Sequence, residues 1–231
     1  MNLSLASGFL LSGVSLFMAY LIVLFLLDSR LDKLARNHMR NSFPYNFYLD
    51  QPIPNRVLLY VLFILSLLFL MVGECFYFIS FGNPFHYILS ILLPLSLLCL
   101  GVSNLLPLSY YRFHIVFSAI GFFLYGLSCA CYSFVTVIPG ALPVGKEGSV
   151  PILVIIGAFG FLTLLSLVNP KLKDWAKMEK TEENGKTYYV KPKVNAYALT
   201  EWIVLFLQVL TALLLFFSVL ATSALTFNGQ G

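Results

Sequence analysis

The sequence predicts an all-α membrane protein, a polytopic bundle of six transmembrane helices that form one transmembrane domain, residues 1–231. Charged residues make up only 10% of the chain and hydrophobic residues 59%, with a mean hydropathy of +0.88. A soluble domain carries about 25% charged residues, so this composition belongs to the membrane class. Crossing a bilayer core takes about 20 apolar residues. We predict six spans, at 9–27, 57–78, 85–102, 113–138, 151–168 and 202–225.

The first apolar run, 9–27, lies where a secretory signal peptide would lie. No Lys or Arg precedes it, and it ends at Asp28 and Arg30 rather than at a small-residue cleavage site. We therefore expect it to remain in the protein as the first transmembrane helix.

The polar loop that follows, residues 28–56, begins with basic residues spaced for one side of a helix. At about 100° per residue, they cover roughly one third of a helical surface. These residues are Arg30, Lys33, Arg36 and Arg40. We expect the first helix to continue here as a basic amphipathic segment near the headgroups. Pro44, Pro52 and Pro54 then oppose regular helix, and the aromatic residues between them suit the membrane interface.

Turn-forming residues separate the later spans. Gly82 and Pro84 mark the turn between the second and third spans. Pro94 lies inside the third span and cannot donate a hydrogen bond to the carbonyl of Ser90, so we expect a kink there. The loop after the fourth span is marked by Pro139, Gly140, Pro143 and Gly145.

Lys and Arg are distributed unevenly between alternate loops. Loops 28–56, 103–112 and 169–201 hold thirteen of the fourteen, and Lys146 is the remaining one. The positive-inside rule places these three loops in the cytoplasm and both termini outside. We expect a multi-pass protein of the cell (plasma) membrane. The net charge of +4 reflects this topology and does not indicate nucleic-acid binding.

The last of these loops, 169–201, contains a predicted β-hairpin. The pair Asn184-Gly185 favours a type I′ turn, and Tyr188 and Tyr189 have strand preference. A two-stranded hairpin is marginally stable alone in water. We expect it to lie on the membrane surface, on loop 28–56 or on a partner. The alternative is a solvated connector whose lysines only enforce topology.

Glu74 is the one carboxylate within the predicted spans. It lies about 25 Å from the inner boundary, counting 1.5 Å per residue from the start of its span. One interpretation is that its side chain reaches the outer headgroups. The other is a functional polar layer in the outer leaflet. The candidate members are Glu74, Cys75, Tyr77, Cys129 and Tyr132.

The cysteines and histidines do not predict a metal or haem site, and no cofactor is expected. Cys129 and Cys131 are about 200° apart on a helix, which is typical of packing residues rather than ligands. His86 and His114 begin spans on opposite sides of a membrane about 30 Å thick, so they cannot bind one iron. With Arg112, His114 is expected to meet phosphate headgroups or adjacent loops. The other predicted lipid or partner contacts are the four basic residues of loop 28–56 and Lys171, Lys173 and Lys177.

Small and polar residues within the spans predict contacts between helices. Gly121 and Gly126 in the fourth span and Gly157 and Gly160 in the fifth allow helices to approach closely in lipid. Gln208, in the sixth span, is expected to make a hydrogen bond between helices.

The start of the fourth span resembles a helix of DRAM-type six-helix membrane proteins. The residues concerned are Arg112-Phe113-His114, followed by Ser118-Ala119 and Gly121. Uncharacterised bacterial six-helix families are similar in length and layout. The resemblance implies a six-helix membrane fold and no functional residues. DRAM-type proteins would have a longer first loop outside, whereas the charge distribution here places loop 28–56 inside.

The sequence favours a non-enzymatic accessory, assembly or interaction protein that uses its basic cytoplasmic loops. It has no nucleophile elbow, zinc motif or phosphate loop, and no acid–base pair at one membrane depth, so an enzyme is not favoured. The expected partners are the lipid bilayer and either anionic headgroups or a cytoplasmic protein. The alternative function is a small transporter or channel, with Glu74 in an outer-leaflet polar layer.

Overall fold

Six long helices form the protein, as the sequence predicts. The computed structural model describes residues 2–30, 39, 42–49, 51–82, 84–106, 110–135, 150–174, 179–183, 186–190 and 194–228. Within these ranges, six helices are long and apolar enough to cross a membrane. They are α1 (Asn2–Asp28), α3 (Ile53–Ile79), α4 (Pro84–Leu105), α5 (Tyr111–Phe134), α6 (Val150–Leu167) and α7 (Ala196–Asn228). The protein is therefore a multi-pass membrane protein.

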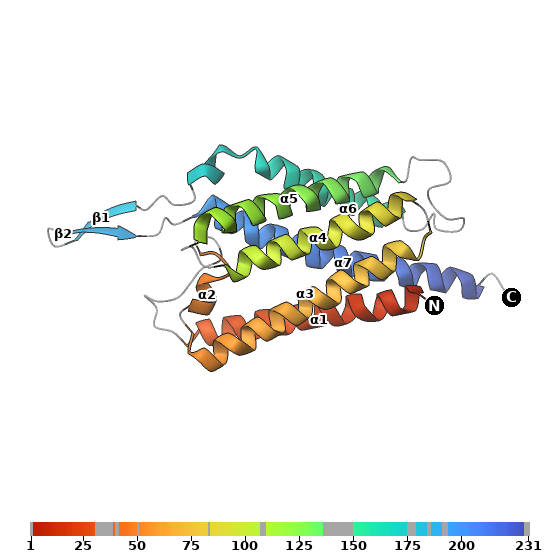
Figure 1. Ribbon diagram of the computed structural model, residues 1–231, viewed down its shortest axis with the longest axis horizontal. Helices are drawn as coiled ribbons and strands as arrows, with labels where there is room; N and C mark the ends of the chain where they lie inside the picture. The colour runs from red at the N-terminus through yellow and green to blue at the C-terminus, as the bar shows by residue number, and fades with distance from the viewer. Residues whose placement is uncertain are drawn as a thin grey trace.

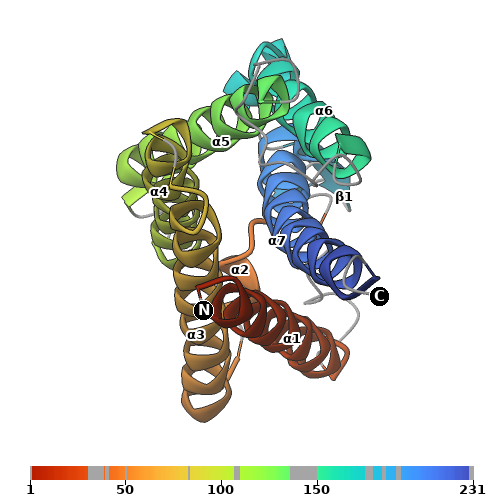
Figure 2. The same cartoon turned by 90° about the vertical axis from the view of Figure 1, so that its right-hand side faces the viewer.

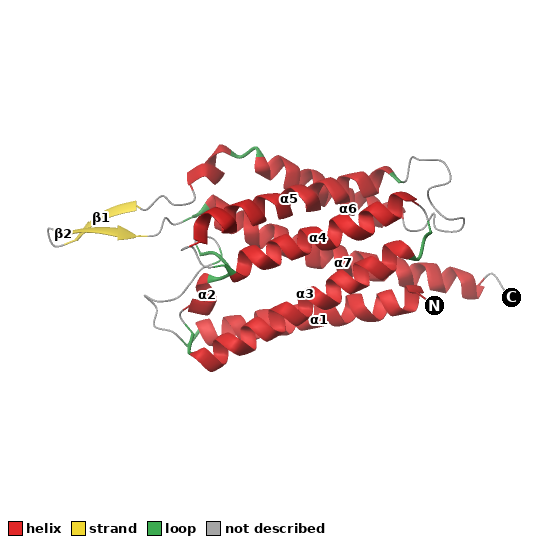
Figure 3. Cartoon of the chain, viewed as in Figure 1, coloured by secondary structure: helices red, strands yellow, loops and turns green. Residues whose placement is uncertain are grey.

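The shorter elements lie at one end of the bundle. They are α2 (Asn46–Leu49), the 3-10 helix η3 (Pro170–Asp174) and the strands β1 (Glu179–Glu183) and β2 (Lys186–Val190). The strands pair antiparallel, with Glu179 opposite Val190 and Glu183 opposite Lys186, so the predicted hairpin is confirmed. Its predicted turn pair, Asn184-Gly185, lies outside the described residues. The hairpin projects beyond the bundle, and the two termini lie at the opposite end (Figures 1 and 3). We name these the hairpin end and the termini end.

The six helices form a closed ring. Each packs on the next in the order α1, α3, α4, α5, α6, α7, and α7 returns to α1 (Figure 2). The outer surface of the ring presents large exposed apolar side chains, among them Ile22, Ile91 and Leu165. An apolar surface of this kind requires contact with the lipid bilayer.

Glycines allow the closest contacts between neighbouring helices. A Cβ atom at Gly13 of α1 would lie 2.7 Å from Leu70 of α3, and one at Gly73 of α3 would lie 2.9 Å from Leu10 of α1. A Cβ at Gly160 of α6 would meet the backbone of α5 itself. Close approach at small residues is how helices gain packing energy in lipid, where apolar burial alone gives little.

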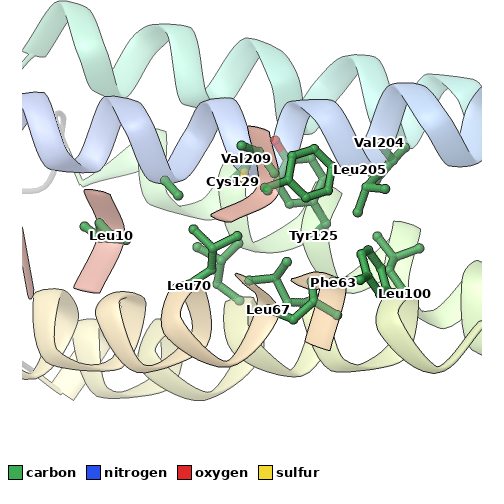
Figure 4. Close-up of a cluster of buried hydrophobic side chains, with 14 of the residues drawn as sticks. Leu10, Phe63, Leu67, Leu70, Leu100, Tyr125, Cys129, Val204, Leu205 and Val209 are labelled. Atoms are coloured by element: carbon green, nitrogen blue, oxygen red, sulfur yellow. The ribbon is translucent and has the colours of Figure 1, made fainter. Parts of the chain in front are cut away.

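The interior of the ring is mostly apolar. In Figure 4, Leu100 of α4 faces Val204 and Leu205 of α7, and Leu70 of α3 lies nearer Val209. Polar groups nevertheless follow the buried face of α7 along about 25 Å, at a rise of 1.5 Å per residue. They are Glu201, Gln208, Thr211 and Ser218. Gln208 Nε2 donates to Ser96 Oγ of α4 at 2.9 Å, which confirms the hydrogen bond predicted between helices.

All six long helices begin earlier than expected, and the first residues of α7 and α3 show why. α7 begins at Ala196 rather than near Trp202, because Asn195 caps it: its side-chain oxygen accepts hydrogen bonds from the amides of Tyr197 and Ala198 at 3.1 and 3.2 Å. α3 begins at Ile53, with prolines at its start. Proline lacks an amide hydrogen, which the first turn of a helix does not need, so Pro54 starts this helix instead of preventing it.

Gly160→Ala should destabilise the bundle by about 1–3 kcal/mol, the usual cost of overpacking a tightly packed contact. The added Cβ would lie 2.5 Å from the Ala130 amide nitrogen and 2.6 Å from the Gly126 oxygen, and backbone atoms cannot move aside easily. The measurement is the Tm of the purified protein in detergent. Gly8→Ala is the matched control, since a Cβ there meets nothing within 4 Å. Equal Tm values for the two variants would contradict the packing described for α5 and α6.

Candidate functional site

The hairpin end contains a buried ion pair. Nε2 of His114, on α5, lies 2.8 Å from Oε1 of Glu201, on α7, and both side chains are 0% exposed. Of the two contacts predicted for His114, phosphate headgroups or adjacent loops, the structure favours the second, because the buried ring contacts Leu106 of loop 103–112 and Phe43 of loop 28–56. Sequence reasoning missed Glu201 because it placed the start of the last helix one residue later. Glu74 is accordingly not the one carboxylate within a transmembrane helix.

The hydrogen bonds of His114 define how many protons the pair holds. Nδ1 lies 3.3 Å from the backbone oxygen of Leu106, and a carbonyl oxygen only accepts, so Nδ1 carries a hydrogen. The close contact between Nε2 and Oε1 then needs one further proton, held between the two groups. Both ring nitrogens are engaged, and His114 has none left to act as a base toward a substrate.

A segment rich in aromatic residues covers this pair. We call residues 42–49 the aromatic strap; its four aromatic side chains are each 4% exposed or less. They are therefore buried within the bundle, and their expected position at the membrane interface stays a prediction. They enter the bundle because its interior supplies partners for polar atoms. Trp202 Nε1 donates to the backbone oxygen of Ser42 at 3.0 Å, and the hydroxyls of Tyr48 and Tyr20 lie 2.7 Å apart.

The strap rests directly on the buried pair. The ring centroids of Phe43 and Tyr45 lie 5.3 and 5.5 Å from that of His114, and both rings are near perpendicular to the imidazole. The Phe47 ring packs edge-on against Trp202 at 5.5 Å. Burial raises the pKa of the Tyr45 phenol, and the nearby Glu201 raises it further. The Tyr45 hydroxyl therefore remains uncharged beside the pair.

Hydroxyl groups extend this site along α5 and α7. The Tyr197 hydroxyl lies 2.5 Å from Ser118 Oγ and donates to the backbone oxygen of Ile115 at 3.2 Å. Tyr197 lies one helical turn before Glu201. The site at the hairpin end thus joins residues of α5, α7 and the strap, three segments far apart in the sequence.

A second buried carboxyl lies in the half of the bundle nearer the termini. Glu74 of α3 is 1% exposed and faces the interior, so its side chain does not reach the outer headgroups. Its Oε2 has no hydrogen-bond partner among the described residues, and no described Lys, Arg or His forms an ion pair with it. An unpaired charge in such a place costs several kcal/mol, which favours the neutral carboxylic acid.

The residues proposed as a polar layer separate into two groups. The Tyr77 hydroxyl lies 3.0 Å from that of Tyr132 and 2.7 Å from Ser218 Oγ, near the termini end. Cys129 is buried close to Glu74, beside Tyr125, whose hydroxyl lies 2.8 Å from Thr211 Oγ1.

Cys75 lies apart from both groups. It follows Glu74 by one residue, about 100° around the helix, and so faces α4. Its thiol donates to the backbone oxygen of Ser90 at 3.3 Å. This is the carbonyl that Pro94 leaves without its helical donor, so the thiol replaces the missing hydrogen bond.

Four of the predicted cationic contacts have described positions, and these lie at the hairpin end. The side chains of Arg30, Arg112, Lys171 and Lys173 are exposed there. The other predicted contacts, Lys33, Arg36, Arg40 and Lys177, fall outside the described residues. The expected amphipathic extension of the first helix falls outside them too. Among the residues with described positions, no three His, Cys, Asp or Glu side chains come together as metal ligands.

Cys75→Ala should lower stability by about 1 kcal/mol, since it leaves the Ser90 carbonyl unpaired in the membrane. Cys75→Ser, which keeps a donor, should retain most of the wild-type Tm. In a Pro94→Ala background the cost of Cys75→Ala should fall toward zero, because the new amide can donate to Ser90. Thermal unfolding in detergent compares the wild type with these four variants. A cost of Cys75→Ala that is unchanged by Pro94→Ala would exclude this compensation.

Comparisons of the chain with protein-family models, curated proteins and solved structures find no match. The likeness to DRAM-type proteins therefore stays a likeness of one helix. The argument for function rests on the geometry of the buried polar groups, because a helical bundle fold by itself implies no activity.

Proposed function

We propose that this protein is a small membrane transporter that moves protons, alone or together with a solute, by means of carboxyl groups inside the helical ring. One observation supports this most directly: Glu74 is 1% exposed, and its Oε2 has no partner among the described residues. Carboxyl groups within transmembrane segments commonly mark ion pathways and proton relays.

The energetics favour a functional interpretation over a structural one. Burying an ionisable group without a partner is costly, and a well-packed apolar residue of similar size would serve packing at least as well. Among the residues that the structure describes, none forms an ion pair with Glu74 that would offset this cost. A carboxyl can accept and release a proton, and an apolar residue cannot take over this role.

The polar face of α7 supplies a route between the two buried carboxyls. Gln208 and Thr211 lie between the level of Glu201 and the termini end, and Thr211 adjoins the group around Glu74. Val204 and Leu205 interrupt the polar face next to Glu201. In this proposal the apolar interruption is the barrier that prevents a continuous leak, and transfer across it requires a change in packing.

The distribution of charge orients the proposed transporter. Thirteen of the fourteen Lys and Arg residues belong to loops 28–56, 103–112 and 169–201, whose described residues lie at the hairpin end, so we place that end in the cytoplasm of a plasma membrane and both termini outside. Glu74 then exchanges protons with the outer side, and the His114–Glu201 pair exchanges them with the cytoplasm.

A second function, docking of a cytoplasmic protein or of anionic headgroups, is favoured by the shape of the hairpin end. The hairpin projects away from the ring, where a two-stranded sheet gains little stability from the bundle. Exposed Arg30, Arg112, Lys171 and Lys173 surround the same end and suit anionic partners.

Glu74→Gln should reduce proton flux at least tenfold in proteoliposomes under an imposed pH gradient, because the amide cannot carry a proton between the two sides. An internal pH-sensitive dye measures the flux. Glu182→Gln, the same chemical change in strand β1, is the control and should leave it unchanged. Wild-type flux in Glu74→Gln would exclude the proposed role of this carboxyl.

A chemical readout accompanies the flux. Hydrophobic carbodiimides react with protonated carboxylic acids in membranes, so mass spectrometry of the treated protein should find the adduct on Glu74. No adduct on Glu74 would show that the carboxyl is not a neutral acid accessible from the lipid phase.

Replacing residues 179–190 with a Gly-Ser linker should abolish cross-links between this protein and a cytoplasmic partner in intact cells, with the Tm of the purified protein unchanged. The physical reason is that the hairpin is the element that extends beyond the bundle. A Gly-Ser replacement of residues 141–148, in the loop between α5 and α6, is the control. Identical cross-linked products from all three proteins would exclude docking through the hairpin.

A further inference from the structure

The His114–Glu201 pair cannot exchange protons with water while the aromatic strap is in place. Both side chains are 0% exposed. Phe43 and Tyr45 of the strap lie against the imidazole, and α5 and α7 are membrane-spanning helices that hold the pair from the other directions. The strap is the short element of this cover, so it is the element whose displacement disturbs the bundle least.

We propose that the aromatic strap is a proton-operated gate: it closes the hairpin end while His114 and Glu201 share one proton, and it opens when the pair gains or loses one. The inference rests on the proposed transport function for its biological use, since it describes how the carboxyl nearer the cytoplasm would exchange its proton. Movement of the strap itself can be measured without any transport.

The net charge of the His114–Glu201 pair explains why the closed state holds one shared proton. With a single shared proton the pair is neutral overall and Nε2 and Oε1 attract each other across 2.8 Å. Loss of that proton sets a carboxylate against the lone pair of Nε2 and leaves one buried negative charge. A second proton sets an imidazolium against a neutral acid and leaves one buried positive charge. Either net charge is costly in a dry interior and is relieved by water.

The groups that face the pair do not compensate such a charge. From the strap the facing titratable group is Tyr45, and from α7 it is Tyr197. The connection between α4 and α5 contributes the uncharged carbonyl of Leu106, and Arg112 at the start of α5 is exposed. Tyr45, Tyr197 and the Leu106 carbonyl carry no charge, so hydration is the available way to stabilise the charged states of the pair.

Trp202 reports directly on the position of the strap. Its Nε1 donates to the Ser42 oxygen, and its ring packs against Phe47. Displacement of the strap breaks both contacts and admits water to the indole. The chain has two tryptophans, Trp175 and Trp202, so Trp175→Phe leaves Trp202 as the single fluorescent reporter.

The test measures acrylamide quenching of Trp202 in the Trp175→Phe protein, reconstituted in lipid nanodiscs, from about pH 4 to about pH 10, a range that spans the ordinary titration of His and Glu. Quenching should be lowest at intermediate pH and at least about threefold higher toward one or both extremes, where the pair gains or loses its proton and the strap opens locally. Circular dichroism at each pH verifies that the helices persist.

Glu201→Gln in the same background is the discriminating variant. Its amide can donate to Nε2 or accept from it without a titrating carboxyl, so quenching should stay low and vary less than in the parent protein. Tyr48→Phe is a second variant, which loses the bond to Tyr20 and leaves the pair intact. Quenching should then be raised at intermediate pH. A flat profile in the parent protein, or an equal rise in Glu201→Gln, overturns the gate.

The flux assay separates this inference from the proposed function. Intact, Glu74-dependent flux with a flat Trp202 profile means that the protein transports protons and the strap is not its gate. A pH-dependent Trp202 profile that Glu201→Gln removes, in a protein without flux, means that the strap is proton-operated and transport is excluded.

Discussion

The contact between His114 and Glu201 is the interaction on which the hairpin end of this protein depends. It joins α5 to α7 inside the ring, where neither group meets water. Its stability requires a shared proton, because a lone carboxylate or a lone imidazolium would be unstable in that place. The aromatic strap packs on the imidazole and on Trp202, so the closed end of the bundle follows from the pair beneath it.

Elsewhere the structure obeys a related constraint, that polar groups inside a membrane need partners within the protein. Gln208 meets Ser96, Tyr125 meets Thr211, and the carbonyl released by Pro94 meets the thiol of Cys75. Some buried polar atoms depart from this pattern: Oε2 of Glu74, Oε2 of Glu201 and Oε1 of Gln208 have no hydrogen-bond partner among the described residues. Glu74 differs from Glu201 in that no described His, Lys or Arg forms an ion pair with it, and this gives the carboxyl its functional interest.

The two buried carboxyl sites differ in a way that suits directional exchange of protons. Glu201 is paired with a second titratable group, His114, and is covered by a short strap. Glu74 is buried between membrane-spanning helices, and no described His, Lys or Arg forms an ion pair with it. Val204 and Leu205 separate them on α7. In the proposed transporter, two sites, an apolar barrier and a short cover would supply the parts that alternating access to two sides requires. The hairpin and the exposed cations of the same end are compatible with a docking function in addition to proton transport.

The sequence by itself determined the features that depend on composition and on neighbouring residues. Length and hydropathy of the apolar runs predicted six transmembrane helices, since a bilayer requires about 20 residues per span. The Asn184-Gly185 pair predicted the hairpin, and an isolated amide in an apolar helix, Gln208, predicted a bond between helices. Such inferences need only the residue types and their spacing along the chain.

Tertiary structure alone decided which distant residues meet. The cap at Asn195 moved Glu201 into the last helix, and the closure of the ring brought it to His114. Ser42 and Tyr48 have hydrogen-bond partners on other helices, Trp202 and Tyr20, and these contacts hold the strap within the bundle. The residues adjacent in the sequence do not predict these contacts, because the segments that meet are separated by long stretches of chain. The candidate site therefore depends on packing that the sequence pattern does not specify.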